Sequence, residues 1–406
     1  MLGLFKLAIR NVFRHRGRTM MTLASIVFGV AALILAGGFI EDTIVETGES
    51  MIRSSSGHLQ VSHAGYWEYG ARSPETYLMS DPVKVRRDLV AMPEVEEAML
   101  RLSFSGLLGN GRTDWSIVGE GVEPSREKRL ASYMTVIAGR RLADDDAFGM
   151  MIGQGVAKAL KLKPGDPVTL LVSTAGGATN LLEFEITGVF QTFSKDYDAR
   201  AVRIPLAAAQ DLLATPGAHT AVILLKETAA TESVARLLND RLRGQGYEIK
   251  TWVELNPFYI QTVTLYQQQF GFLVVVILAM LLMTVSNTVN MGIFERASEF
   301  GTMRAMGDRS VHLVKVIVIE SVCLGFLGAC IGVVLGIGLA KLISLVGIPM
   351  PPPPNADQGY VSHILVVPSV VGLAFVVGLL SAVLASLKPA FSISRKPIAE
   401  TLRAGV

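Results

Sequence analysis

Residues 291–320, MGIFERASEFGTMRAMGDRSVHLVKVIVIE, form a short charged segment between two long apolar runs. An apolar run of about 20 residues is long enough to cross a bilayer as a helix. A polar segment this short, between two spans, has no room for an active site of its own. It is well placed to be bound by a partner protein at one face of the membrane.

Hydropathy predicts four membrane spans. Half of the 406 residues are hydrophobic and the mean hydropathy is +0.43, which is too apolar for an ordinary soluble protein. The predicted spans are 20–40, 270–294, 316–346 and 364–387. The apolar core of the second span is 270–288. The third span is longer than a bilayer requires, so we expect it to tilt or protrude.

Basic residues predict the orientation of the spans. Segment 1–19 carries five Lys and Arg residues and no acid, segment 289–315 carries four Lys and Arg residues, and the tail 388–406 carries four more. Loop 347–363 has no Lys or Arg. The positive-inside rule therefore places both termini and 295–315 in the cytoplasm, and 41–269 and 347–363 outside. Segment 1–19 has helical amphipathic spacing, which indicates a helix in the inner headgroup region; the alternative is a basic flank that only sets topology.

The large outer segment, 41–269, is predicted to fold as an α+β or α/β domain with one core or two subdomains. It holds 23 Lys and Arg against 29 Asp and Glu, a net charge of −6, which argues against nucleic-acid binding. Alternating apolar residues predict strands at 57–62, 115–119, 168–172 and 182–189. Helical spacing predicts helices at 83–92, 156–160, 206–213 and 231–244.

The pattern from residue 257 to 294 is that of one continuous helix, which begins at Pro257 and would be about 55 Å long. A rigid helix of that length would join the outer domain to the cytoplasmic segment as a lever. The alternative is a break near 267–271, with a separate outer helix and membrane helix.

Motifs for nucleotide, metal or nucleophile chemistry are missing from the sequence. It contains no GxxxxGK[ST], HExxH, CxxC or GxSxG pattern. We therefore expect no catalytic residue, no metal site and no cofactor bound by this chain. His58 with His63, and the run Asp144–Asp146, are expected to be structural or solvated rather than metal ligands. Cys323 and Cys330 are expected to be small residues of a packed helix face.

Two features of the third span invite an interpretation. Glu320 is an acid inside an apolar run, which is either a functional intramembrane carboxylate or a group paired with Lys315 or Arg304; the pairing is favoured. Gly328, Gly332 and Gly336 recur every four residues, a spacing that lets two membrane helices approach closely. Their partner is a span of the same chain or of a second copy.

Several short motifs resemble a known family. At 295–307 the sequence ERASEFGTMRAMG resembles the FtsX-like ABC permease signature R-x-x-E-I-G-x-x-R-A-x-G, and Glu320-Ser321 follows as in that family. The tail, with Lys388-Pro389-Ala390 and Lys396-Pro397, resembles the family's closing motif. Within 41–269, Gly139-Arg140, Gly165-Asp166 and Gly188-Val189 are similar to motifs of the MacB-like periplasmic core domain.

The resemblance implies a permease subunit of the type VII ABC exporters, closest in architecture to the lipoprotein-releasing branch. It implies four membrane helices, a periplasmic α+β domain, a bacterial inner-membrane location and transmission of force across the membrane. The implied partners are a cytoplasmic ABC ATPase that holds ATP and Mg, a second permease copy or paralogue, membrane lipids and a periplasmic lipoprotein carrier. The implied coupling residues, with Phe300 and Met303 as apolar anchors for the ATPase, are Glu295, Arg296, Glu299, Phe300, Gly301, Thr302, Met303, Arg304, Ala305, Met306 and Gly307.

The function expected from the resemblance is extraction of a lipoprotein or lipid from the inner membrane toward the outer membrane. Two alternatives stay open. One is efflux of a peptide or drug from the periplasm, and the other is a signalling lever that activates periplasmic hydrolases.

Overall fold

The structure is a computed structural model that describes residues 16–70, 73–130, 133–174, 176–192, 194–351, 359–397 and 401. Most of the amphipathic helix predicted at 1–19 lies outside these residues. The chain divides into two compact units. We call 1–45, 262–349 and 361–406 the helical unit, and 46–261 with 350–360 the α+β domain.

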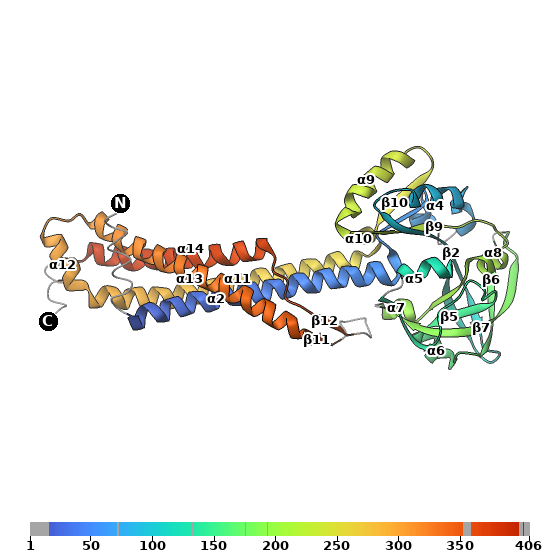
Figure 1. Cartoon of the computed structure of the whole chain (residues 1–406), viewed down its shortest axis with the longest axis horizontal. Helices are drawn as coiled ribbons and strands as arrows, with labels where there is room; N and C mark the ends of the chain where they lie inside the picture. Colours follow the sequence, from blue (N-terminus) through green and yellow to red (C-terminus); the bar gives the residue numbers. More distant parts are fainter. Residues whose placement is uncertain are drawn as a thin grey trace. The chain divides into compact units, whose positions relative to one another are not determined.

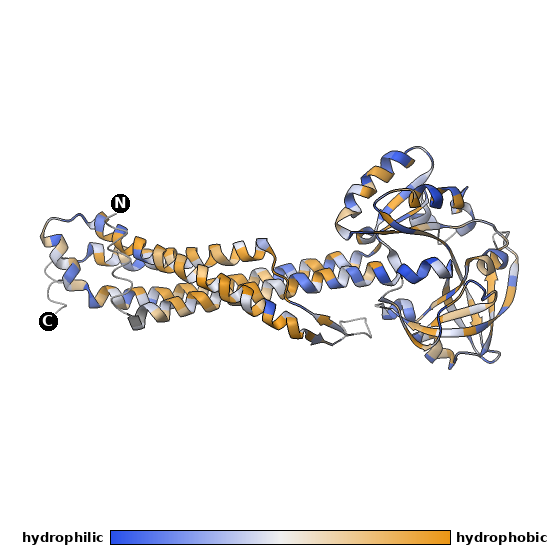
Figure 2. Ribbon diagram, in the orientation of Figure 1, coloured by the Kyte–Doolittle hydropathy of each residue, from blue (hydrophilic) through white to orange (hydrophobic). Residues whose placement is uncertain are grey.

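The helical unit contains four helices that are long and apolar enough to cross a membrane, in agreement with the predicted spans. They are α2 (Arg16–Met51), α11 (Pro257–Glu295), α13 (Ser310–Val346) and α14 (Pro368–Arg395), with the short α12 (Ala297–Ala305) between the second and third (Figure 1). Figure 2 shows all four as hydrophobic along most of their length. The fourth begins at Pro368 rather than at 364, because a proline disfavours helical geometry in the residue before it.

Helix α11 is continuous. It runs for 39 residues, and residues 267–271 are helical throughout, so the prediction of one helix is confirmed and the alternative with a break is wrong. Its proline lies at the first position, where the missing N–H would have no intrahelical partner in any case.

Helix α2 ends in a π-helical turn, η1 (Ile52–Ser56). The turn closes with Gly57, whose φ of +64° favours glycine and whose N–H donates to the carbonyl of Ile52 at 3.0 Å. A Cβ at Gly57 would lie 2.5 Å from Val222, so no larger residue fits where the chain turns toward the sheet.

The α+β domain contains two subdomains with separate cores, which confirms the second of the two predicted arrangements. The first has the strand order β10-β1-β9-β2, all antiparallel, with α4 and α9 packed in its core. Its elements are β1 (Leu59–His63), β9 (Thr220–Leu225), β10 (Tyr247–Thr251), α4 (Pro82–Val90) and α9 (Thr231–Leu242).

The second subdomain is a closed six-stranded barrel. Strand β2 pairs with β3, then β8, β5, β7 and β6 follow, and β6 pairs again with β2, so the ring has no free edge. Strand β4 adds to β7 outside this ring. The strands are β2 (Val95–Gly109), β3 (Asp114–Val122), β4 (Thr135–Gly139), β5 (Gly149–Gly153), β6 (Pro167–Ser173), β7 (Thr179–Gln191) and β8 (Ala201–Pro205).

Strand β2 belongs to both subdomains. Its residues Val95–Arg101 pair with β9, and Leu102–Gly109 pair with β3. The sequence pattern missed this 15-residue strand because its consecutive buried residues, 98–102, lack the alternation of a half-buried strand. All four predicted strands and all four predicted helices of the domain are present within a few residues of their expected bounds.

The remaining elements are short. The helix α8 (Leu206–Leu213) packs on the barrel, and β11 (Ile348–Met350) pairs with β12 (Tyr360–Ser362). The others are α3 (Tyr66–Tyr69), η2 (Pro74–Tyr77), α5 (Pro124–Leu130), α6 (Gln154–Leu160), α7 (Lys195–Asp198), η4 (Thr228–Ala230) and α10 (Trp252–Leu255).

Candidate functional site: the coupling helix and the charge network

The predicted coupling segment is a single short helix between two turns. Helix α11 ends at Glu295, Arg296 leaves the helical path with φ −109° and ψ 14°, and α12 begins at Ala297. At the other end Gly307 has φ +100°, which ends α12 because a side chain is rarely tolerated there. Helix α13 then starts at Ser310, so α12 is linked to a membrane helix on each side by only a few residues.

Arg296 joins α12 to α13. Its Nη1 donates to Glu320 at 3.2 Å and its Nε to Glu299 at 3.0 Å. The structure therefore pairs Glu320 as favoured, but the predicted partners are wrong. Lys315 is five residues before Glu320, which puts it on another face of the helix, and Arg304 donates instead to the carbonyl of Lys396 at 2.5 Å.

Phe300 is not an anchor for a partner. Its side chain is 3% exposed and packs with Ile293 and Leu313, together with Ile317, Ala390 and Ile393. The expectation that it contacts the ATPase is therefore wrong, because its surface is already covered by the chain's own helices. The spacing of the apolar residues did not predict this, because the chain leaves the helical path at Arg296, so Ile293 of α11 and Phe300 of α12 meet only in the folded structure.

Other residues of the coupling segment are exposed, in contrast to Phe300. Met306 is 78% exposed, whereas Met303 is half-buried and packs beside Phe300. Of the other predicted coupling residues, Gly301 is buried, Arg296 and Arg304 are half-buried, and those exposed are Glu295, Glu299, Thr302, Ala305 and Gly307. Among residues 295–307, the exposed large apolar side chain is that of Met306, the residue that follows the end of α12.

The glycines of α13 pack against α2 of the same chain. A Cβ would lie 2.9 Å from Ile26 at Gly328, 2.8 Å from Val30 at Gly332 and 3.0 Å from Ile34 at Gly336. Of the two partners left open by the sequence, the structure selects a span of the same chain. Close backbone approach of this kind is what small residues permit between membrane helices.

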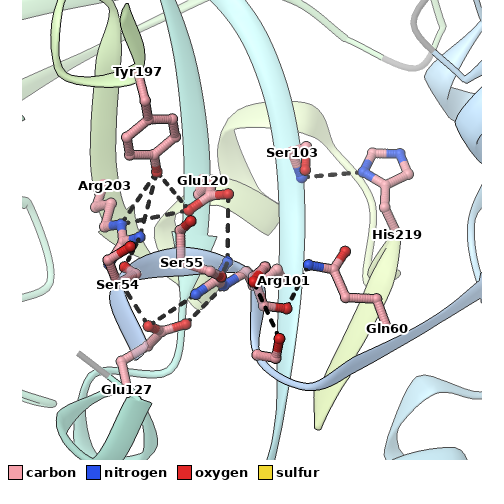
Figure 3. A network of polar contacts seen from close by, with 12 residues as sticks. Ser54, Ser55, Gln60, Arg101, Ser103, Glu120, Glu127, Tyr197, Arg203 and His219 are labelled. Carbon is pink, nitrogen blue, oxygen red and sulfur yellow. Dashed lines mark hydrogen bonds and ion pairs between the residues drawn. The ribbon is translucent and has the colours of Figure 1, made fainter. Parts of the chain in front are cut away.

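A buried charge network lies where the π-turn η1 meets the barrel, and no pattern in the sequence predicted it. Arg101 of β2 donates to Glu127 of α5 through Nε at 2.8 Å and Nη2 at 3.1 Å (Figure 3). Its Nη1 donates to the carbonyl of Ser55 at 2.6 Å. Arg203 of β8 pairs with Glu120 of β3, the oxygen–nitrogen distance being 3.4 Å.

The groups in this network also make further hydrogen bonds. Tyr197 donates its hydroxyl to Glu120 at 2.9 Å, and Arg203 also reaches the carbonyl of Ser54 at 3.5 Å. Both arginine side chains are at most 4% exposed. Among the described residues, every fully buried side-chain nitrogen and oxygen has a hydrogen-bond partner. A buried network in which every group has a partner holds its side chains in one geometry and leaves no group free to react.

The electrostatics agree with a structural role. Burial raises the pKa of Tyr197, so its hydroxyl stays protonated as a donor. Burial alone would raise the pKa of Glu120, but Arg101 and Arg203 hold it below its ordinary value. The carboxylate is therefore charged at neutral pH and cannot act as a proton donor.

A second polar chain ties the end of α2 to the first subdomain. The N–H of Leu225 donates to Nδ1 of His58 at 3.1 Å, so the imidazole proton lies on Nε2, which donates to Thr228 at 3.0 Å. Thr228 donates in turn to Glu49 of α2. Burial lowers the pKa of His58 to about 4. His58 is thus structural, and the described residues contain no cluster of metal ligands.

Sequence comparisons agree with both units. The MacB-like periplasmic core domain matches residues 19–241, more than half of the chain, and the FtsX-like permease C-terminal domain matches 270–398. The chain belongs to the FtsX-like permeases with a MacB-like periplasmic core domain. The α+β domain is therefore periplasmic. The predicted fold class, four spans with an α+β domain between the first and the second, is confirmed.

Relatives of this permease include an uncharacterized ABC transporter permease of Methanocaldococcus jannaschii, 23% identical over 366 residues, covering 83% of each chain. The lipoprotein-releasing system transmembrane protein LolC of Neisseria meningitidis is 23% identical, covering 79% of this chain and 76% of LolC. The macrolide export ATP-binding/permease protein MacB of Bordetella avium is 23% identical, covering 98% of this chain and 59% of MacB.

These relatives are components of ABC transporters, which implies a partner ATPase for this permease. The four apolar helices and the family place it in the inner membrane as a multi-pass protein. The chemistry of the two candidate sites fits this class. Glu299 of α12 and the adjacent Met306 are exposed, and the charge network provides rigid packing.

Proposed function

We propose that this chain is the non-catalytic permease subunit of a mechanotransmission ABC transporter, with the coupling helix α12 as the contact for the ATPase. The observation that carries the proposal is the position of α12. It directly follows the continuous 39-residue helix α11 and is joined to α13 by the Arg296–Glu320 pair. ATP and Mg are held by the partner, and the chain itself supplies the mechanical parts.

The contacts around α12 support transmission of force. A displacement of α12 would move Phe300 against the core that it shares with α13 and α14, because close-packed side chains transmit strain. The same displacement would be carried along α11, whose backbone hydrogen bonds are unbroken as far as Pro257. The proposal includes cytoplasmic termini, a cytoplasmic α12 and a dimer with a second copy or paralogue.

For the cargo, we propose a lipoprotein or lipid that is taken from the inner membrane and passed to a periplasmic lipoprotein carrier. The support is the similarity to LolC, a lipoprotein-releasing protein, over three quarters of both chains. A second candidate is efflux of a peptide or drug, and it is favoured by one observation. The periplasmic domain contains a cavity of about 660 Å³, the size of a small-molecule site. The signalling lever has no comparable support.

The coupling assignment is tested by co-purification with the ATPase. Met306→Glu places a charge on the exposed apolar group of α12, so we expect it to abolish association and the permease-dependent ATPase activity. The matched control is Leu237→Glu, the same change at an exposed position of α9 in the periplasmic domain, which should leave both unchanged. If Met306→Glu keeps full association and activity, α12 is not the coupling surface.

The cargo is tested separately in spheroplasts. Deletion of this chain should abolish ATP-dependent release of a lipidated reporter protein while leaving the same reporter without its lipid unaffected. Unchanged release of the lipidated reporter would exclude the lipoprotein cargo without touching the coupling assignment. Accumulation of an amphipathic drug in the deletion strain would favour efflux, and co-purification of a cell-wall amidase would favour signalling.

A further inference from the structure

We propose that the cavity of about 660 Å³ in the α+β domain is a binding site for a lipophilic amine. The ligand is a drug-sized molecule with an apolar aromatic or ring body and a protonated nitrogen. The inference rests on the second candidate function, drug efflux, and names the class of ligand; binding itself is measured without the ATPase and without transport. It rests on the apolar floor of the cavity, one aromatic wall and the charge at its rim.

The floor of the cavity is apolar and rigid. It is formed by Leu102 and Phe104 of β2 and by Leu213 of α8. All three side chains are at most 8% exposed and belong to the core of the barrel. Their positions are fixed by that packing, so the apolar body of a ligand would meet a preformed surface and lose little free energy to ordering it.

One wall is an aromatic pair that carries no charge. The rings of Tyr66 and His219 are stacked, 5.2 Å apart and 19° from parallel. Nδ1 of His219 accepts the N–H of Ser103 at 3.1 Å, as Figure 3 shows, and Nε2 donates to the carbonyl of Pro74 at 3.0 Å. Burial lowers the pKa of His219 below its ordinary value. The histidine therefore supplies a neutral ring rather than an anion-binding cation.

The charge at the rim favours a cationic ligand. Glu75 is exposed, and it is the one charged side chain among the described residues that line the cavity. The faces of Tyr66 and Trp67 also attract cations. Lys250 lies 5.2 Å from the Trp67 ring centroid, but it does not line the cavity and its charge is offset by Glu248 at 3.7 Å. A carboxylate or phosphate on the ligand would meet Glu75 with no basic partner among these residues.

The remaining lining disfavours a plain acyl chain. Five residues with hydroxyl groups, from three parts of the domain, line the cavity: Ser103 and Ser105, Ser173 and Thr174, and Thr215. A hydrocarbon chain would remove these groups from water and return no hydrogen bonds, which costs free energy. A ligand with polar substituents on an apolar body satisfies both kinds of lining.

The test uses the full chain in lipid nanodiscs without ATPase, with empty nanodiscs as the blank. Three dansyl probes share one fluorophore and differ in the tail: dansylcadaverine is cationic, N-pentyl dansylamide is neutral, and dansyl-aminohexanoate is anionic. We expect dansylcadaverine to bind most tightly, with energy transfer from tryptophan that Trp67→Phe reduces. Glu75→Gln should weaken it about fivefold, the upper end for an exposed ion pair, and leave the neutral probe unchanged.

Two controls make the result decisive. Glu68→Gln removes an exposed acid of α3 that does not line the cavity, and it should change no affinity. Thr215→Tyr should fill the cavity and weaken the cationic and neutral probes alike, and unchanged tryptophan emission would show that the variant is folded. The proposal is overturned if Glu75→Gln and Glu68→Gln behave alike, if palmitate displaces the probe and a lipophilic amine does not, or if Thr215→Tyr has no effect.

Discussion

The two groups of ion pairs in this permease differ in how completely their partners enclose them. In the charge network of the α+β domain, Arg101 and Arg203 are at most 4% exposed and are surrounded by carboxylates, a phenol and backbone carbonyls. At the coupling helix, Glu299 keeps 43% of its side chain exposed although it contacts Arg296. The first group fixes one geometry, and the second leaves surface for a partner.

Ion pairs of the same residue types therefore have different effects on the structure according to how deeply they are buried. A buried ion pair is costly to break because the remaining charge has no water, whereas an exposed pair contributes little and exchanges partners readily. The molecule also contains a reporter for each unit. All three tryptophans, Trp67, Trp115 and Trp252, lie in the α+β domain, and both cysteines, Cys323 and Cys330, lie in α13 of the helical unit.

The largest effect is expected for Arg101→Met. Glu127 would stay buried without its bidentate partner, so the free energy of unfolding of the α+β domain should fall by about 3–5 kcal/mol. Urea titration of the full chain, followed by tryptophan emission, measures this domain selectively. The control is Arg140→Met, which breaks the pair with Asp146 at an exposed arginine and should change the free energy of unfolding far less. Similar losses for both variants would contradict the contrast between enclosed and exposed pairs.

A smaller effect is expected from pH. The pKa of His58 is about 4 in the folded protein and near 6.5 when unfolded, so below pH 6.5 the unfolded state binds a proton that the folded state does not. The stability of the α+β domain should therefore be complete above pH 6.5 and fall by about 3 kcal/mol as the pH drops toward 4.

The same urea titration at several pH values checks this. His58→Gln should flatten the pH dependence in part, since burial also lowers the pKa of His219. His63→Gln is the matched control, because His63 is half-buried and its Nδ1 donates only to the neighbouring carbonyl of Ala64, at 3.0 Å. A slope that is steeper in His58→Gln than in the native chain would refute the assignment.

At the coupling helix, Glu320→Gln should cost about 1–2 kcal/mol, because Arg296 loses one charged partner and keeps Glu299. The rate of thiol labelling at Cys323 and Cys330 on heating measures the helical unit. We also expect weaker coupling between cargo and ATPase activity. The double exchange Arg296→Glu with Glu320→Arg should restore part of the stability and part of the coupling. If Glu320→Gln alters neither the thiol labelling nor the coupling, the pair does not join α12 to α13.

The smallest effect is expected for Glu299→Gln. This exposed pair should contribute less than about 0.5 kcal/mol, so thiol labelling should match that of the native chain. Affinity for the ATPase should nevertheless decrease, since Glu299 lies on the outward face of α12. A stability loss as large as that of Glu320→Gln would mean that the two carboxylates are equivalent, against the difference in their exposure.

Much of the fold could be predicted because the spans, helices and strands each have a recognisable local sequence pattern. The hydropathy of four runs identifies the spans, and the spacing of residues 206–213 and 168–172 identifies a helix and a strand without knowledge of their partners. Strand β2 escaped prediction because it is buried on both sides in its middle, where periodicity is lost. The position of the coupling segment in the chain was predicted, but which of its side chains are buried was not. Phe300 is buried and Met306 is exposed.

The positions of the four apolar spans and the glycine spacing of α13 follow from the order of residues along the chain, since each depends on neighbours within a few turns. The pairing of Arg296 with Glu320, the contact of Gly332 with Val30, and the meeting of Arg101 with Ser55 depend on residues 24 to 302 positions apart. Only the folded chain brings such groups together, because burial and partnership are properties of the whole packing and leave no periodic trace in the sequence.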